Sequence, residues 1–163
     1  MNKIIFSILF AIGLNATCIN VLNNTNEIGR LIKIDYCDDG MYHLMIKNNN
    51  KYLQDYYSNI SDSEFDMLID AYQKTISWTD KVEEAKANIS KKIEIKPNEL
   101  GVVFSSRDDG KSIQVLLVGF KNKIENGTFS FHNKNSLIEH SSQLEKIKKE
   151  SKERIKELNS LLK

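Results

Sequence analysis

Apolar and polar residues alternate near the start of the chain in a pattern that predicts a β-hairpin. Ile32, Ile34 and Tyr36 are separated by charged residues, as on a strand with one buried face. Asp38-Asp39-Gly40 follows and leads into a second β-prone run over residues 41–46. Asp-Gly between two such runs is a strong hairpin signal, because glycine accepts a positive φ without a Cβ clash.

A second hairpin is predicted in the other half of the chain. Residues 100–105 and 112–120 are rich in apolar side chains, and Arg107-Asp108-Asp109-Gly110 lies between them. Further strands are expected at residues 93–95, where isoleucine alternates with charge, and at residues 128–131. The short turns between neighbouring runs favour an antiparallel sheet.

After the first hairpin the spacing of the apolar residues changes to that of an α-helix. Ser61 and Glu64 are spaced as a capping box, in which the serine caps the backbone and the glutamate reaches back. The apolar residues beyond them recur every three or four positions, on one face of an α-helix: Phe65, Leu68, Ile69, Tyr72 and Ile76. A second stripe that includes Trp78 and Val82 indicates a second packing partner for this helix.

The last part of the chain predicts a second helix, from about Ser136 to the C-terminus. Ser136 and Glu139 are spaced as another capping box. An apolar stripe, interrupted by Ser151, consists of Leu144, Ile147, Ile155, Leu158 and Leu162. Lysine and glutamate dominate the other faces, as on a solvated helix surface.

Together these elements predict an α+β fold, with a mostly antiparallel sheet of about five or six strands and two helices packed on it. The two halves also resemble each other. Each has a hairpin with an Asp-Asp-Gly turn, then a short segment with aromatic residues, then a helix that starts Ser-x-x-Glu. This repetition suggests the hypothesis of an old internal duplication.

The N-terminus has the pattern of an export signal, over residues 1–18. Lys3 precedes an apolar run over residues 4–14, and small residues follow. As a helix the run would span about 16 Å, too short for a hydrocarbon core of about 30 Å. Residues 19–29 are expected to be a flexible lead-in, and residues 30–163 a single α+β domain. The protein is thus expected to be exported to the periplasm, the cell surface or the extracellular space.

The two cysteines have alternative fates in an exported protein. Cleavage after Ala16 or Thr17 would leave Cys18 free to form a disulfide with Cys37. Residues 14–18 also partly resemble a bacterial lipobox, in which case Cys18 would carry a lipid anchor. Cleavage after Cys18 would leave Cys37 as a lone, buried thiol. The lipid anchor is the one membrane contact that the sequence predicts.

Charge and spacing argue against several classes of partner. The chain has 23 basic and 22 acidic residues, and loss of Lys3 with the signal would make it neutral, so nucleic acid is not expected as a partner. No cofactor and no metal is predicted, because glycine-rich phosphate loops are absent and the cysteines lack zinc-ligand spacing. The three histidines form no His-x-His or His-Glu-x-x-His pattern.

Catalysis has no recognisable pattern in this sequence. There is no Gly-x-Ser-x-Gly elbow, although paired carboxylates from distant positions would leave no local signature. No catalytic residue is therefore proposed, and the enzyme question stays open with a preference for a protein that is not an enzyme.

Tyr52, Tyr56, Tyr57 and Trp78 are the candidate binding patch, because tyrosine and tryptophan dominate interface hot spots. The alternative is that they fill the core beneath the first helix. The favoured function is a non-catalytic binding or interaction module whose partner is another protein or an envelope component. The alternatives are a lipid-anchored envelope lipoprotein with a partner-binding C-terminal helix, and a hydrolase with unrecognised acid/base residues.

Overall fold

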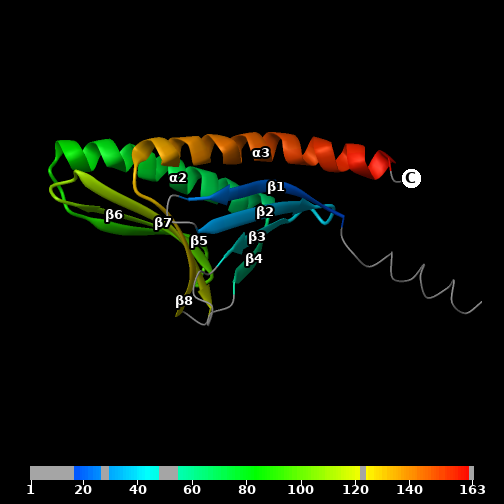
Figure 1. Ribbon diagram of the computed structural model, residues 1–163, viewed down its shortest axis with the longest axis horizontal. Helices are drawn as coiled ribbons and strands as arrows, with labels where there is room; N and C mark the ends of the chain where they lie inside the picture. Colours follow the sequence, from blue (N-terminus) through cyan, green and yellow to red (C-terminus); the bar gives the residue numbers. More distant parts are fainter. Residues whose placement is uncertain (1–16, 27–29, 48–54, 122–123, 162–163) are drawn as a thin grey trace, which may run out of the picture.

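The computed structural model describes residues 17–26, 30–47, 55–121 and 124–161 of the chain. Within them, two four-stranded antiparallel sheets alternate with two long helices (Figure 1). The α+β class is confirmed. Apart from Thr17 and Cys18, the proposed export signal lies outside the described residues, as do Tyr52 and Leu162.

The first sheet, sheet A, is a simple antiparallel meander. Its strands lie in chain order, as β1 (Cys18–Thr25), β2 (Leu31–Cys37), β3 (Tyr42–Ile46) and β4 (Tyr56–Ile60). The predicted first hairpin is β2–β3, in which Ile34 faces Leu44 and Tyr36 faces Tyr42. Since alternate side chains of a strand point to opposite faces, Ile32, Ile34 and Tyr36 of β2 share one face with the buried residues of β3.

Helix α2 (Asp62–Glu84) follows sheet A directly, and its capping box is confirmed. The Ser61 hydroxyl accepts a hydrogen bond from the Glu64 backbone N–H at 3.3 Å, and the Ser61 backbone N–H donates to Glu64 Oε2 at 2.7 Å. Phe65, Leu68 and Tyr72 from the predicted stripe are fully buried. The Phe65 ring stacks on that of Tyr42 with the centroids 3.9 Å apart, so α2 packs on the core face of sheet A.

The second sheet, sheet B, repeats the meander with β5 (Ser90–Lys96), β6 (Leu100–Arg107), β7 (Ser112–Lys121) and β8 (Ile124–Phe131). Its β6–β7 turn has positive φ at Asp108, Asp109 and Gly110. A Cβ on Gly110 would lie 2.1 Å from the Val82 carbonyl oxygen. Glycine is therefore needed there both for its backbone angle and for the close approach of the turn to α2.

Helix α3 (Lys134–Leu161) begins earlier than the sequence pattern predicts. The Asn133 side-chain oxygen accepts a hydrogen bond from the Ser136 backbone N–H at 2.8 Å, as an N-cap residue does. The predicted capping box of Ser136 and Glu139 is therefore wrong, because asparagine caps a helix as well as serine and stands three residues earlier. No helix in the described parts of the chain is long and apolar enough to span a membrane.

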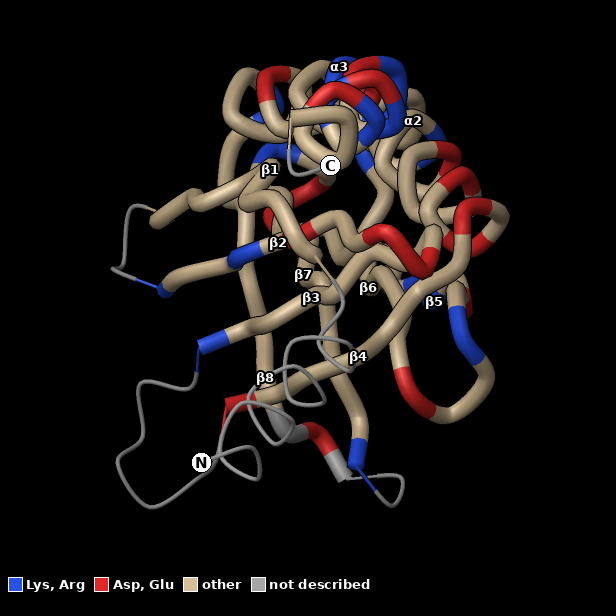
Figure 2. The backbone as a smooth tube through the Cα atoms, turned by 90° about the vertical axis from the view of Figure 1, so that its right-hand side faces the viewer, with Lys and Arg blue, Asp and Glu red and all other residues tan. Residues whose placement is uncertain are grey.

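The two helices pack side by side and cover the sheets as one layer (Figure 1). Buried side chains from both sheets and both helices form one connected core cluster. Lysine, arginine, aspartate and glutamate are interspersed along the outer sides of the helices, as Figure 2 shows. The molecule therefore turns its apolar surface inward, between the helix layer and the two sheets.

Two sequence predictions about the sheet are wrong. Instead of one sheet of five or six strands there are two sheets of four, and a long helix follows each meander in the chain. Residues 18–25 are strand β1, whereas residues 19–29 were expected to be a flexible lead-in; residues 27–29 lie outside the described residues. The asparagines of β1 are typical of a linker, but Leu22 is buried and Ile19 and Val21 pack against the core.

The order of elements in the first half recurs in the second half. Each half is a four-stranded meander followed by a long helix, and each Asp-Asp-Gly turn joins the second and third strands of its sheet. This shared order is what the hypothesis of an internal duplication requires.

Candidate functional site

A polar cavity lies where α3 meets the two edge strands β1 and β8. Its volume is about 200 Å³. We call it the His140 cavity, and its polar lining includes Asn24, Asn26, Ser130, Ser136, Glu139, His140 and Gln143. Phe129 and Phe131 of β8 add an apolar wall. The cavity thus combines amides, hydroxyls, an imidazole and one carboxylate with aromatic surface, and small-molecule sites commonly pair polar groups with aromatic walls in this way.

A second hollow of about 360 Å³ continues from this cavity between β1 and α3. We call it the β1–α3 groove. Asn24 and Gln143 line both spaces, so the two are adjacent. Lys146, Glu150 and Arg154 of α3 also line the groove and bring both signs of charge. Most of the charged residues therefore lie at the groove end of the combined site, and Glu139 is the charged residue among the amides and hydroxyls of the described cavity lining.

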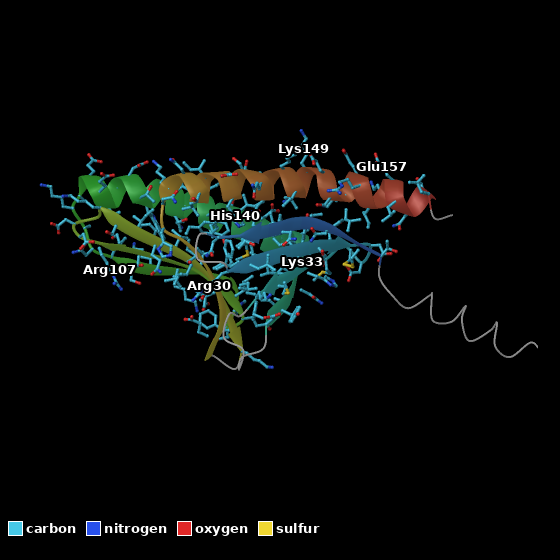
Figure 3. All side chains as sticks on the ribbon, in the orientation of Figure 1. Arg30, Lys33, Arg107, His140, Lys149 and Glu157 are labelled. Carbon is cyan, nitrogen blue, oxygen red and sulfur yellow. A yellow bond between two sulfur atoms is a disulfide. The ribbon has the colours of Figure 1, made fainter. Side chains whose placement is uncertain are left out.

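His140 is the most buried titratable residue of the cavity, with 3% of its surface exposed. Figure 3 shows it on the side of α3 that faces the strands, whereas Lys149 and Glu157 point away from them. Its ring centroid lies 4.8 Å from that of Phe131 and 5.2 Å from that of Tyr72. Burial among these rings lowers the pKa of His140 to about 4, so the imidazole is neutral near pH 7.

The tautomer of His140 follows from its contact with Asn24. The Asn24 amide nitrogen lies 3.5 Å from His140 Nδ1, and an amide N–H can only donate. Nδ1 must therefore accept, which places the ring proton on Nε2. The Nε2 atom is buried and has no hydrogen-bond partner among the residues that the structure describes. A buried donor without an acceptor is destabilising by about 1–3 kcal/mol, so such a group calls for an explanation.

Side chains from the β1–β2 connection bind the open edge of β8. The Asn26 amide donates to the Ser130 carbonyl at 3.0 Å, and the Arg30 guanidinium donates to the Thr128 carbonyl at 3.2 Å and to the Thr128 hydroxyl. Asn24 in turn donates to Gln143 Oε1 at 2.6 Å. These contacts tie β1, β8 and α3 together around the cavity and occupy two of the β8 carbonyls that a further strand would need.

The predicted aromatic patch does not form one surface. Tyr56 is buried and its hydroxyl donates to the Glu99 carbonyl at 2.7 Å, whereas the neighbouring Tyr57 is 69% exposed on the opposite face of β4. Trp78 lies on α2 and packs edge-on against Phe104 with the ring centroids 5.6 Å apart. Tyr56 is thus a core residue and Trp78 is half-buried against the core, as in the alternative interpretation, whereas Tyr57 is exposed among the described members of the patch.

Cys18 and Cys37 form a disulfide between β1 and β2. They face each other in the β1–β2 ladder, so the pairing of the strands places the two side chains together. Among the three fates of the cysteines, the structure thus contains the disulfide. Cys18 is also the first residue of β1, so a signal that ended at residue 18 would remove half of this bond.

The cavity can hold a ligand, but its groups are not arranged as a nucleophile and its base. Among the residues that the structure describes, no serine hydroxyl and no carboxylate hydrogen-bonds His140, which has the Asn24 amide as its polar contact. Activation of a serine needs such a contact, commonly at about 2.6–3.2 Å. The chemistry that these side chains offer directly is hydrogen bonding to an oxygen-bearing ligand.

Sequence reasoning missed this site because its residues come from distant parts of the chain. Asn24 lies in a segment that was expected to be a lead-in, and 116 positions separate it from His140. One local signal was available. His140 stands three positions after Leu137 and four before Leu144, on the buried stripe of α3, and a histidine there has to be buried.

Comparisons of the chain with known proteins found no match among protein-family models, curated proteins or solved structures. Its function therefore has to be inferred from the geometry of the cavity and the groove.

Proposed function

We propose that this chain is an exported, non-catalytic binding module that holds an uncharged, oxygen-rich ligand in the His140 cavity. The observation that carries the proposal is the buried, unpartnered Nε2–H of His140 in a cavity lined by amides and hydroxyls. A protein retains such a donor at a cost, and an acceptor atom supplied by a ligand would remove that cost.

The groups around the cavity favour a neutral ligand with several acceptors. Asn24 and Asn26 already donate to groups of the protein, so the donors that a ligand would meet are the Nε2–H of His140, the Gln143 amide and the Ser136 hydroxyl. The described lining contains Glu139 but no lysine or arginine, and His140 is uncharged near pH 7. A strongly anionic ligand would lack a counter-charge there, while the carbonyl and hydroxyl oxygens of a saccharide or a peptide would find donors.

The disulfide supports export. Disulfides persist in oxidising compartments and are rare in the cytosol of most organisms. The sequence pattern of residues 1–18 points to the same compartment. The lipid-anchored alternative needs a free thiol at Cys18, and one sulfur atom cannot carry both a lipid and a disulfide. The partner is accordingly a component of the envelope or of the extracellular space, bound by a protein without a lipid anchor.

The test is ligand-observed NMR of the mature protein with a panel of neutral saccharides and short uncharged peptides. We expect at least one class to show saturation transfer from the protein, and Gln143→Ala to weaken that binding about tenfold, as the loss of a well-placed hydrogen bond does. Gln73→Ala is the matched control, because Gln73 is an exposed glutamine on the neighbouring helix, outside the cavity.

Two outcomes would contradict the proposed function. The first is that no member of the panel transfers saturation, although the protein is folded. The second is that Gln143→Ala and Gln73→Ala bind a ligand equally well. In the second case the ligand would lie elsewhere, for example at Tyr57, which is the exposed member of the aromatic set.

A further inference from the structure

Three side chains with metal-binding atoms meet at one end of sheet A, away from the His140 cavity. In the strand ladders Cys18 faces Cys37, and Asp35 faces His43. Cys37 lies two positions beyond Asp35 on β2 and so shares its face of the sheet with His43. The two sulfur atoms and an imidazole nitrogen all lie within 4.8 Å of one another.

Two thiolates and an imidazole are a donor set that a tetrahedral zinc ion uses in proteins. Zinc binds sulfur at about 2.3 Å and imidazole nitrogen at about 2.0–2.1 Å, which separates its ligand atoms by roughly 3.5–3.8 Å. The upper limit of 4.8 Å on the present separations leaves room for that spacing after a small movement of the side chains, and the disulfide at present holds the two sulfur atoms in bonding contact. Disulfide and metal are therefore alternative states of the same three side chains.

The surroundings of His43 favour a cation once the thiols are free. Within the described parts of the chain, His43 Nε2 is buried without a hydrogen-bond partner, and the Asp39 Oδ2 atom lies 3.5 Å from it. A carboxylate beside a histidine ligand fixes the ring and favours positive charge nearby. Cys18 is exposed, which gives an ion a path to the site.

We propose that the reduced chain binds one zinc-type divalent ion through Cys18, Cys37 and His43, so that the redox state of the disulfide controls a metal site. A dithiol reductant supplies two electrons and two protons to open the disulfide and is itself oxidised to a disulfide. The ion then displaces the two thiol protons as the thiolates bind it. This site goes beyond the proposed binding function and does not depend on the His140 cavity.

The test is an anaerobic titration of the mature chain with cobalt(II), a coloured probe for zinc sites. The protein is reduced with a phosphine, which is removed before the metal is added. We expect one cobalt ion per reduced chain, with a sulfur-to-cobalt charge-transfer band, and no such band in the oxidised chain. His43→Gln should weaken cobalt binding at least about tenfold, because the loss of even an outer-sphere partner of a metal ligand has that effect.

The controls separate this site from adventitious binding. His132→Gln should bind cobalt like the reduced wild type, because His132 lies on another part of the molecule. Cys18→Ser should lose most of the charge-transfer band. Circular dichroism follows the fold, and if reduction loosens the chain, zinc should restore the spectrum. The proposal is overturned by the absence of the band, by equal affinity in His43→Gln and wild type, or by a loosened chain that zinc does not restore.

Discussion

At the scale of single residues, His140 shows how a buried histidine can be held neutral. Its ring is enclosed by Tyr72, Phe129 and Phe131, and its nearest polar neighbour is the Asn24 amide. A charged imidazolium in that place would lose its hydration and gain no counter-ion. This explains both the lowered pKa and the orphaned Nε2–H, which a neutral ring leaves as a hydrogen-bond donor.

This environment predicts a specific loss of stability at acidic pH. The pKa of His140 is about 4 in the folded protein against an ordinary value of 6.5, so between these values the unfolded chain binds a proton that the folded chain excludes. The stabilisation is fully present above pH 6.5 and is lost as the pH falls towards 4. Its size is at most about 3 kcal/mol, at about 1.36 kcal/mol for each pKa unit.

The measurement is urea unfolding of the wild type and of His140→Phe at several pH values across that window. Carboxylates titrate in both proteins, so the difference between the two curves isolates His140. We expect the free energy of unfolding to fall more steeply in the wild type. Parallel curves would mean that His140 is already hydrated in the folded protein, and with it the argument for an orphaned donor would fail.

At the scale of elements, the contact between the two sheets depends on one ring and two glycines. Gly119 of β7 and Gly127 of β8 face each other in their ladder, and Tyr56 of β4 lies against them. A Cβ on Gly119 would lie 2.4 Å from the Tyr56 ring, and one on Gly127 would lie 2.8 Å from Tyr56 Cβ. Glycine is required at these positions because the sheets approach so closely.

A double-mutant cycle tests this contact. Gly119→Ala should cost about 1–3 kcal/mol as an overpacked substitution, and Tyr56→Ala about 3–5 kcal/mol as a large cavity. In the Tyr56→Ala protein the added methyl group has room, so Gly119→Ala should cost far less and the coupling energy should exceed about 1 kcal/mol. Chemical denaturation measures all four proteins. Tyr57→Ala is the control, and its free energy of unfolding should lie within about 0.5 kcal/mol of the wild-type value. If the costs of Gly119→Ala and Tyr56→Ala simply add in the double variant, the two residues are not in contact.

The elements that were predictable are those whose signals are local. The alternation of apolar and polar residues on both sides of Asp38-Asp39-Gly40 is sufficient to predict the β2–β3 hairpin. The spacing of Ser61 and Glu64 is sufficient to predict the start of α2. Strand β1 was missed because its asparagines resemble a linker, while its order comes from pairing with β2 and from contacts with α3. The division into two sheets and the His140 cavity depend on which distant elements pack together. The local sequence around each element does not indicate these contacts.

At the scale of the whole molecule, the edge strand β1 links the proposed ligand site to the disulfide. Among the described strands, β1 pairs with β2 alone, and a bulge interrupts that ladder between Asn20 and Leu22. Yet β1 supplies Asn24 to the cavity and Cys18 to the disulfide. The disulfide ties β1 to the sheet at the end opposite the cavity. Anything that removes Cys18 therefore weakens the wall of the proposed ligand site as well as the sheet.

This dependence leads to a prediction about the mature protein, expressed with its own first residues. The Asp38 backbone N–H donates to the Thr17 carbonyl at 3.0 Å, which continues the β1–β2 ladder past Cys18, so we expect cleavage after Ala16. The intact mass should then show a chain that starts at Thr17, lacks two hydrogens and carries no acyl group.

Reduction, or the double variant Cys18→Ser with Cys37→Ser, should lower the free energy of unfolding by about 3 kcal/mol, because the bond closes a loop across a sequence separation of 19 residues. An acylated Cys18 would instead establish the lipid-anchored form, and the disulfide, the redox-controlled metal site and the support for β1 would all be lost together.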